Sequence, residues 1–212
     1  MRKKLLSIYN KLYKAFGPRR WWPGDTPFEV VVGAILTQNT AWTNVEKAIT
    51  NLKRERLLDP NALCAVSKSK LAKLIRPAGY YNIKAKRLKN FTDVLSGEFA
   101  NDPDKLFSLP LKRLRARLLD INGIGPETAD SITLYAAGKP IFVIDAYTKR
   151  VFSRHKLIKE DATYSQMQEL FMENLPRSRR LFNEYHALIV ELGKLYCRKR
   201  PKCGECPLKV RS

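Results

Sequence analysis

The sequence predicts an all-α protein, and three features of its 212 residues support this fold class. Apolar residues recur at spacings of three and four along most of the chain, which is the period of a helix with one buried face. Strand-like alternation of apolar and polar residues is nearly absent. Prolines and glycines stand where such helices would begin or end. We therefore expect short helices joined by turns.

The apolar stripes place the helices of the first half in order. They predict helices over residues 5–16, 28–35, 45–52, 71–74 and 83–95. The first helix is expected to end at Gly17-Pro18 and the last of this group at Gly97, because glycine and proline interrupt helices.

Proline also marks helix starts in the second half. Two short helices are expected after Asp102-Pro103 and after Pro110, because proline suits a first helical turn. Residues 140–144 have a β-like composition, but the segment is short enough to be a buried connector. Further helices are expected over residues 126–137, 146–155, 164–175 and 179–196.

The charge balance points to a polyanionic partner. The chain has 40 Lys and Arg against 20 Asp and Glu, a formal net charge of +20. This favours nucleic acid over an anionic membrane surface, with a merely well-solvated surface as the plain alternative. Hydrophobic residues make up 44%, enough to build a core, which excludes a disordered basic tail. No apolar run approaches the roughly eighteen residues of a membrane span, so we expect a cytosolic protein without membrane contact.

The most informative segment is residues 119–130, Leu-Asp-Ile-Asn-Gly-Ile-Gly-Pro-Glu-Thr-Ala-Asp. A helix over about 111–118 would enter a turn containing Gly123 and Gly125, and a second helix would open with Pro126. The free N–H groups at the start of that helix favour an anion, so we expect a phosphate contact at these glycines and Thr128. Gly-x-Gly alone would equally fit an ordinary helix-turn-helix corner.

Residues 122–130 resemble the helix-hairpin-helix of the DNA glycosylase superfamily that includes endonuclease III. Residues 35–40 and 79–87 agree with that family too, so the match runs from about residue 26 to the C-terminus. The resemblance implies two helical lobes: 24–132, with the hairpin at about 111–131, and 1–23 joined to 133–212. It also implies a nucleoid-associated monomer that binds double-stranded DNA with a damaged base during base excision repair.

Asp145 stands where this superfamily has an essential aspartate, in Val143-Ile-Asp-Ala-Tyr-Thr-Lys-Arg-Val151. The resemblance implies that its carboxylate faces C1′ of a flipped nucleotide, stabilises positive charge on the sugar and orients the attacking water. An aspartate before a helix is also a common N-cap, and the two roles are compatible.

Glu127 stands where bifunctional members of the superfamily carry a lysine. That lysine forms a Schiff base with C1′, and a carboxylate cannot form an imine. The sequence therefore predicts a monofunctional glycosylase. Lys149 or another lysine could take over the role, so an endonuclease III-type glycosylase with lyase activity stays as an alternative.

The tryptophans suggest the lesion. Residues 19–25, Arg-Arg-Trp-Trp-Pro-Gly-Asp, and the Leu-Thr-Gln-Asn-Thr of residues 36–40 resemble the branch that excises 3-methyladenine. Ring faces attract an alkylated, cationic base. The expected base-pocket residues are Trp21, Trp22, Pro23 and Trp42, with Gln38 as the wedge that fills the duplex.

Other interpretations of these residues stay open. The Trp-Pro segment could simply close the core. A mismatch-specific uracil or thymine glycosylase is the alternative enzyme. A non-catalytic DNA-binding hairpin protein would keep the charge and the hairpin without depending on Asp145.

Three of the four cysteines lie near the C-terminus: Cys197, Cys203 and Cys206. Thiolates at this spacing could bind zinc or an iron–sulfur cluster. By resemblance to endonuclease III we expect a [4Fe–4S] cluster in a loop over 197–212. The fourth cysteine of the family is replaced here by Ser212, so the ligand set is incomplete. Cys64 is more simply a core residue.

Overall fold

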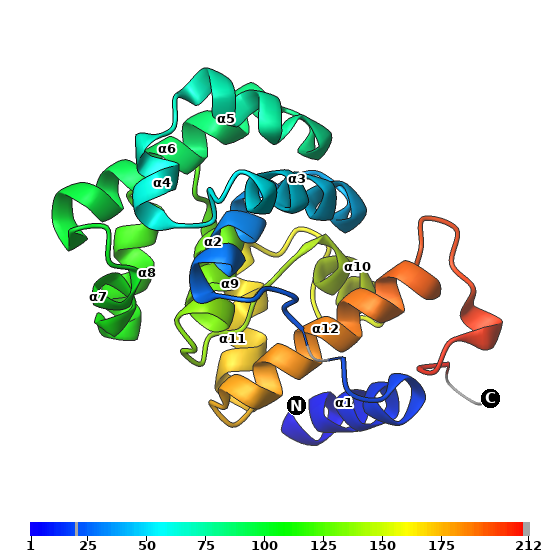
Figure 1. Cartoon of the computed structure of the whole chain (residues 1–212). Coiled ribbons are helices and arrows are strands. Elements are labelled where there is room, and N and C mark those ends of the chain that lie inside the picture. The colour runs from blue at the N-terminus through cyan, green and yellow to red at the C-terminus, as the bar shows by residue number, and fades with distance from the viewer. Residues whose placement is uncertain (20, 210–212) are drawn as a thin grey trace. The chain divides into compact units, whose positions relative to one another are not determined.

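The computed structural model describes residues 1–19 and 21–209, and within these ranges it contains helices, turns and loops but no β-strand. The predicted all-α class is therefore confirmed (Figure 1). The chain divides into two compact units, one formed by residues 22–139 and the other by residues 1–21 together with 140–212.

Four helices of residues 22–139 begin at a side chain that caps them. Thr26, Asp59, Ser67 and Asp102 each accept a hydrogen bond from a backbone N–H two or three residues further on. In order, the elements are α2 (Pro27–Leu36), α3 (Trp42–Arg54), α4 (Pro60–Ala65), α5 (Lys68–Leu74), η1 (Arg76–Ala78), α6 (Tyr81–Phe99), α7 (Pro103–Ser108), α8 (Leu111–Leu119), α9 (Pro126–Ser131) and the π-helical η2 (Ile132–Ala136).

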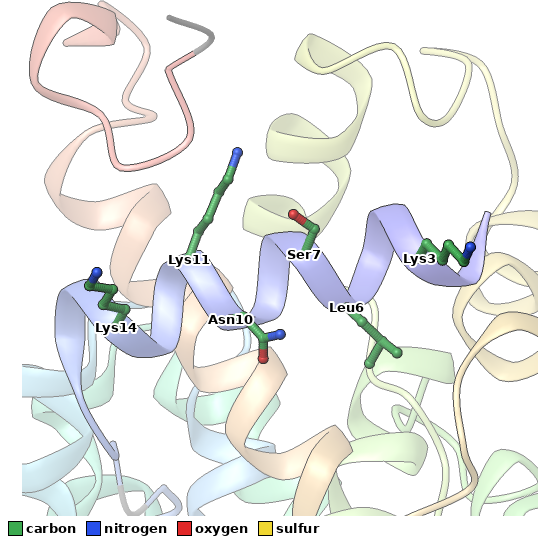
Figure 2. Close-up of a pocket in the computed structure, with 6 residues that line it drawn as sticks. All are labelled: Lys3, Leu6, Ser7, Asn10, Lys11 and Lys14. Carbon is green, nitrogen blue, oxygen red and sulfur yellow. The ribbon is translucent and has the colours of Figure 1, made fainter.

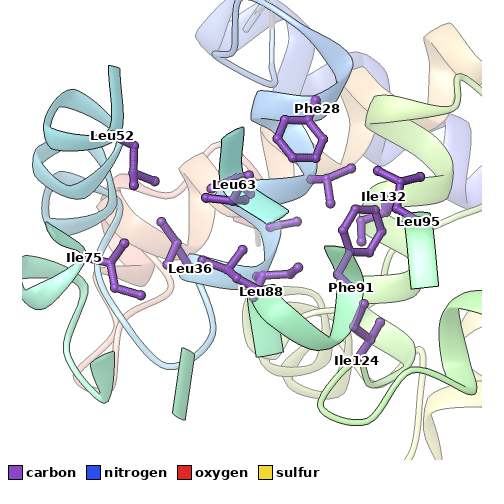
Figure 3. Packing of buried hydrophobic residues seen from close by; sticks show 14 of the residues in the cluster. Phe28, Leu36, Leu52, Leu63, Ile75, Leu88, Phe91, Leu95, Ile124 and Ile132 are labelled. Atoms are coloured by element: carbon purple, nitrogen blue, oxygen red, sulfur yellow. The ribbon is translucent and has the colours of Figure 1, made fainter. Parts of the chain in front are cut away.

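Helix α2 lies at the centre of this unit, and every residue from Phe28 to Leu36 is buried. It packs against α6 and η2, with the Phe28 ring 6.5 Å from the ring of Phe91. Figure 3 shows Leu88 and Ile132 in the same cluster. A helix that is apolar all round is expected to be buried on all sides, and α2 is.

The end of α6 and the presence of α4 differ from the prediction. The expected end at Gly97 is wrong, because α6 continues to Phe99 and is terminated by Ala100 in the left-handed region at φ 53°. Helix α4 was not expected, although Asp59-Pro60 has the same cap-and-proline form as the predicted start of α7. A cap signal without a long apolar stripe behind it is easily missed.

Helix α6 buries a lysine, whereas Ile83, the first residue of the apolar stripe that predicts this helix, is 52% exposed. Lys84 is 1% exposed, and its Nζ donates to the carbonyls of Leu36 (2.8 Å) and Ala78 (2.7 Å). Burial lowers the pKa of Lys84 to about 8. The ammonium thus satisfies carbonyls at the ends of α2 and η1, and it fixes the turn that follows α2.

The hairpin between α8 and α9 is fixed from both sides. Arg115 of α8 donates Nε to Asp130 Oδ1 (2.6 Å) and Nη2 to Oδ2 (3.2 Å), and the Asp130 side chain is fully buried. Asn90 of α6 donates its amide to the Asn122 carbonyl at 2.8 Å. A two-point guanidinium–carboxylate contact holds the two helices in one orientation.

The second unit packs around α12. Its elements are α1 (Arg2–Phe16), α10 (Ala146–Arg154), α11 (Tyr164–Asn174), α12 (Arg179–Leu195) and η3 (Cys203–Glu205). Tyr185 of α12 lies edge-on to Phe142 (5.8 Å) and Phe171 (6.0 Å), and its hydroxyl donates to the Leu5 carbonyl at 2.8 Å. This buried ring joins α1, α11 and α12 into one core.

Residues 140–144 form the buried connector that the sequence predicts. Their backbone groups bind side chains of α11 in place of a neighbouring strand: Gln168 donates to the Phe142 carbonyl (2.7 Å), and the Ile144 N–H donates to Tyr164 Oη (3.3 Å). Every buried backbone group needs a partner, and these partners come from a helix. The connector leads directly into α10.

No helix in the described ranges combines the length and the apolar composition needed to cross a membrane.

Candidate active site

Asp145 stands between the buried connector and α10, where its backbone is extended (φ −120°, ψ 179°). Its Oδ1 accepts from the Thr148 N–H at 2.7 Å and from the Thr148 hydroxyl at 2.8 Å. Asp145 is therefore an N-cap, as the residue type predicts. The cap uses one carboxylate oxygen and leaves the other for a different partner.

That second oxygen, Oδ2, lies 3.6 Å from Nε2 of His186 on α12. The two side chains are only 11% and 6% exposed. Burial by itself would raise the pKa of Asp145, but the His186 imidazole and the two bonds from Thr148 outweigh it and hold that pKa below 3.8. The site thus keeps a carboxylate ionised while shielding it from water, which strengthens its action on a nearby positive charge.

The two hairpin glycines differ in what they require. Gly123 has φ 97°, a conformation that strains any residue with a Cβ, and an added Cβ would overlap the Arg87 side chain. Gly125 has an ordinary φ of −89°, and nothing lies within 4 Å of where its Cβ would be. The fold therefore requires a glycine at position 123, whereas the space beside Gly125 is open and could admit another molecule.

Replacing Gly123 by alanine should lower the free energy of unfolding by roughly 1–3 kcal/mol, the cost of a strained backbone conformation. Thermal unfolding followed by circular dichroism measures the change. Gly125→Ala is the matched control, and its unfolding temperature should stay at that of the wild type because its backbone and surroundings accept a methyl group. Equal stability of the two variants would contradict this division of roles.

Gln38, the predicted wedge, is tied to the hairpin. Its Nε2 donates to the Gly123 carbonyl (3.0 Å) and to Thr128 Oγ1 (2.9 Å), and its Oε1 accepts from Arg87. The structure thus brings Gln38, Gly123 and Thr128 together. The exposed tip of the same turn is Asn39, at φ 53°.

Thr128 and Glu127 lie in the first turn of α9 with opposite exposure. Thr128 is 6% exposed, and its hydroxyl faces Gln38. Glu127 is exposed to solvent. Any phosphate contact of Thr128 would therefore be made by its backbone N–H, whereas the Glu127 side chain lies at the surface.

The predicted pocket residues separate into two groups. The Trp22 ring packs edge-on against Trp42 with centroids 5.3 Å apart, and it lies 5.2 Å from the ring of Tyr135 in η2. Gly33 of α2 makes room for them, because a Cβ there would come within 3.2 Å of Trp22 Nε1. Trp21 belongs to the other unit, where Lys194 lies 5.7 Å from its ring centroid.

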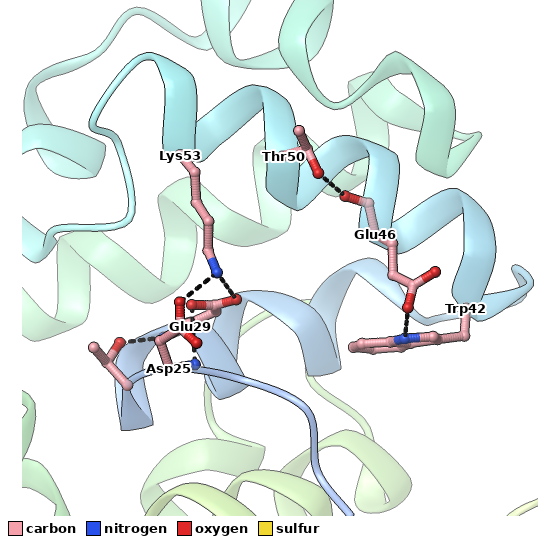
Figure 4. A network of polar contacts seen from close by, with 7 residues as sticks. Asp25, Glu29, Trp42, Glu46, Thr50 and Lys53 are labelled. Atoms are coloured by element: carbon pink, nitrogen blue, oxygen red, sulfur yellow. Dashed lines mark hydrogen bonds and ion pairs between the residues drawn. The ribbon is translucent and has the colours of Figure 1, made fainter.

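A cavity of about 320 Å³ opens beside α2 and α3, and Trp42 and Pro23 are among its lining residues. An ionic network forms part of its wall (Figure 4). Lys53 Nζ contacts Asp25 Oδ2 at 2.7 Å and Glu29 Oε1 at 2.8 Å, and these two bonds raise the pKa of Lys53.

The family follows from a match to the central part of the chain. The model described as HhH-GPD superfamily base excision DNA repair protein matches residues 32–177, which include Gln38, the hairpin and Asp145. The chain belongs to the HhH-GPD superfamily. The resemblance inferred from the hairpin and its flanking segments is therefore confirmed.

Relatives of this HhH-GPD protein cover almost its whole length. A Methanocaldococcus jannaschii protein, described as a candidate DNA repair glycosylase, is 51% identical over 97% of this chain and 94% of its own length. The crystal structure of an H. pylori 3-methyladenine DNA glycosylase bound to 1,N6-ethenoadenine is 31% identical, with a TM-score of 0.76, covering 91% of this chain and 95% of that one. An endonuclease III–DNA covalent intermediate has a TM-score of 0.83 at 22% identity, over 98% of this chain and 93% of that one, and supports the fold.

The cysteine loop of this HhH-GPD chain provides three of the four thiolates expected of a [4Fe–4S] site. Burial and the charges of Cys197 and Cys203 raise the pKa of Cys206. No group of three Cys, His, Asp or Glu side chains among residues 1–19 and 21–209 has the arrangement of a metal site. Ser212, the predicted fourth position, lies outside the described residues. The donor set is incomplete in the described part.

Two arginines of α10 hold the start of this loop. Arg150 Nε donates to the Cys197 carbonyl at 2.6 Å, and Arg154 Nη1 donates to the Arg198 carbonyl at 2.6 Å and to Cys197 Sγ at 3.3 Å. Helix α10, which Asp145 caps, therefore also positions the basic loop.

A larger hollow, of about 470 Å³, runs along the exposed face of α1 and contains none of the predicted site residues (Figure 2). It is shallow, and three of its six lining side chains are lysines, Lys3, Lys11 and Lys14. It is suited to contact with a polyanion and does not enclose a small molecule.

The sequence analysis did not identify three residues that contact the predicted site residues: His186, Gly33 and Glu46. His186 sits in the apolar pattern of α12, where a histidine gives no signal before its partner is known. Gly33 did leave a signal, since a glycine inside an apolar helix costs about 1 kcal/mol relative to alanine and so calls for a steric reason. Glu46 was also findable, because it lies one helical turn after Trp42 and accepts from its indole N–H at 2.8 Å.

Proposed function

We propose that the protein is a monofunctional DNA glycosylase that removes an alkylated purine such as 3-methyladenine from double-stranded DNA. The observation that carries this proposal is the carboxylate of Asp145, which is nearly buried yet held ionised beside His186. A fixed anion in a water-poor site is what glycosidic cleavage needs, because the sugar becomes positively charged as the bond breaks.

In the proposed reaction the electron pair of the C1′–N bond leaves with the base and neutralises its positive charge. The Asp145 carboxylate stabilises the resulting cation at C1′ and orients a water, whose oxygen bonds to C1′ while a proton is released. Thr148 and His186 hold the carboxylate in place. An alkylated purine is a good leaving group, so no general acid is required to protonate it.

The aromatic wall supports an alkylated purine as the substrate. Trp42 lines the cavity and Trp22 packs against it, while Gly33 leaves space for both rings. The H. pylori relative that binds 1,N6-ethenoadenine is 31% identical over 91% of this chain. We propose that Pro23, which also lines this cavity, completes the pocket.

We propose that DNA contacts come from the backbone around Gly125 and from exposed lysines such as those of α1. The Gly-x-Gly turn leaves space for a phosphate, and phosphate contacts supply affinity that does not depend on sequence. On this model the two compact units act as the two lobes. Gln38 would leave its bonds to the hairpin to enter the gap left by the flipped base.

A lyase that uses another lysine is less well supported. Lys84 has a pKa lowered to about 8, but its ammonium is buried between two carbonyls. Lys149 is exposed on the first turn of α10, and its backbone N–H donates to the Asp145 carbonyl at 3.0 Å.

The proposed function is tested with duplexes that each carry one defined lesion: 3-methyladenine, 1,N6-ethenoadenine, a uracil mismatch or an oxidised pyrimidine. We expect release of the alkylated purine and an unbroken strand until alkali is added. Release of uracil or thymine alone would favour the mismatch glycosylase. Binding without release of any base would favour a non-catalytic hairpin protein.

We also propose that Cys197, Cys203 and Cys206 bind a [4Fe–4S] cluster, with Ser212 at the sequence position expected for the fourth ligand. The cluster would supply structure to a basic loop that contacts phosphate. Protein purified without oxygen is expected to be brown and to contain about four irons per chain. Cys203→Ala should weaken DNA binding more than Lys202→Ala, the same change at the neighbouring residue, does. The reason is that binding of the cluster by the cysteines would fold the whole loop. An iron-free protein with full DNA affinity would contradict this proposal.

A further inference from the structure

The cavity beside α3 is acidic, in contrast to the protein as a whole. Three carboxylates and one ammonium line it, although the chain carries a net charge of +20. The lining comes from the segment before α2, from α2 itself and from one face of α3: Pro23, Gly24, Asp25, Glu29, Gly33, Trp42, Glu46, Ile49, Thr50 and Lys53. A surface that only had to bind DNA would gain nothing from this local negative charge.

The single lysine of the cavity is already engaged. Lys53 contacts both Asp25 (2.7 Å) and Glu29 (2.8 Å), so these three side chains form one network (Figure 4). Glu46 forms no ion pair within the described part of the chain. Its charge is therefore the one at this cavity that a bound cation would compensate.

Glu46 is also held in a defined place. Its Oε1 accepts from the Trp42 indole N–H at 2.8 Å, one turn earlier on α3 (Figure 4). That bond uses one carboxylate oxygen and leaves the second able to accept from a ligand. The same bond orients the indole whose ring lines the cavity. A flat cation in the cavity would thus meet an aromatic ring and a carboxylate together.

We propose that Glu46 is a specificity-determining residue that selects purines bearing a positive charge and an exocyclic amine. This inference rests on the proposed function and adds a substrate class to the same cavity. An N-alkylated adenine in DNA carries its charge partly on the amine edge, which can donate to the free oxygen of Glu46. A neutral base would cover the carboxylate without compensating its charge, and that costs free energy. The site therefore favours the damaged base and disfavours the normal one.

The test uses full-length protein and two small probes, cationic 3,9-dimethyladeninium and neutral 9-methyladenine. Tryptophan fluorescence quenching measures their affinities for wild type and for Glu46→Gln, which keeps the size of the side chain and its ability to accept from Trp42. We expect the preference for the cation to fall about tenfold in Glu46→Gln, as for loss of one charged hydrogen bond. Glu55→Gln, the same charge change at the end of the same helix and outside the cavity, should leave the preference unchanged.

Excision of 3-methyladenine from a duplex is measured in parallel. If the cation preference of the probes falls in Glu46→Gln but wild type releases no alkylated base, the cavity is assigned correctly and the proposed function is wrong. If wild type releases the base and the probe preference is the same in both proteins, the role of Glu46 is wrong. A gain in affinity for undamaged duplex, with no change in probe preference, would show that Glu46 only repels phosphates.

Discussion

Asp145→Asn is expected to lower the rate of base release by about 10³-fold or more, since it removes the charge that stabilises the transition state. Binding to a duplex with an abasic site should be nearly unchanged, because that affinity comes from phosphate contacts. Asparagine is as good an N-cap as aspartate, so α10 should still begin at Ala146, with residue 145 as its cap. Single-turnover release and a binding titration on the same preparation measure the two effects.

Thr148→Val provides the control for this prediction. It removes the hydroxyl bond to Asp145 (2.8 Å) and keeps both the backbone bond and the carboxylate. We expect a loss of stability of about 1 kcal/mol and a far smaller loss of rate than in Asp145→Asn. If Asp145→Asn lost binding and activity together, a misfolded helix start would explain the result and the catalytic assignment would fail.

The same carboxylate gives a pH dependence with a definite sign. The pKa of Asp145 in the folded protein lies below its ordinary value of 3.8, so the folded state favours the ionised form. The stability from this group is therefore complete above pH 3.8 and is lost as the pH falls through the folded pKa. Between pH 5 and 8 Asp145 stays ionised, and any change of rate in that range must come from another group.

The sequence predicted the features that depend on local spacing. The hairpin, the N-cap at Asp145 and the connector over 140–144 all follow from residues adjacent in the chain. The family resemblance added the role expected of Asp145. Local spacing failed at the end of α6, where Ala100 adopts a left-handed conformation that glycine would have adopted more readily.

The features that could not be predicted from the sequence depend on contacts between distant segments of the chain. His186 acquires meaning only beside Asp145, which lies 41 residues earlier. Lys84 looks like one more surface cation until α6 packs it against the end of α2. The acidic cavity likewise needs Asp25 and Lys53 to meet across 28 residues. A periodic pattern of apolar residues cannot reveal such pairs, because each partner, taken alone in the sequence, fits an ordinary structural role.

The identity of residue 127 is expected to decide whether the enzyme can be trapped on DNA. Wild type should give no covalent adduct with an abasic duplex under borohydride, because Glu127 offers no amine for an imine. Glu127→Lys should give a trapped adduct that denaturing electrophoresis detects. The new amine lies on the exposed first turn of α9, at the position where bifunctional relatives carry their nucleophile by the resemblance described above.

The matched control for this gain of function is Asp104→Lys. Asp104 is also an exposed acidic residue that follows a proline in the first turn of a short helix, Pro103–Ser108, so the change in charge and local structure is the same. Only position 127 adjoins the hairpin, and only that variant should be trapped. A strong adduct with wild type would mean that another lysine, such as Lys149, attacks C1′, and the monofunctional assignment would be wrong. Equal trapping by the two lysine variants would show that proximity to DNA, and not the hairpin position, produces the adduct.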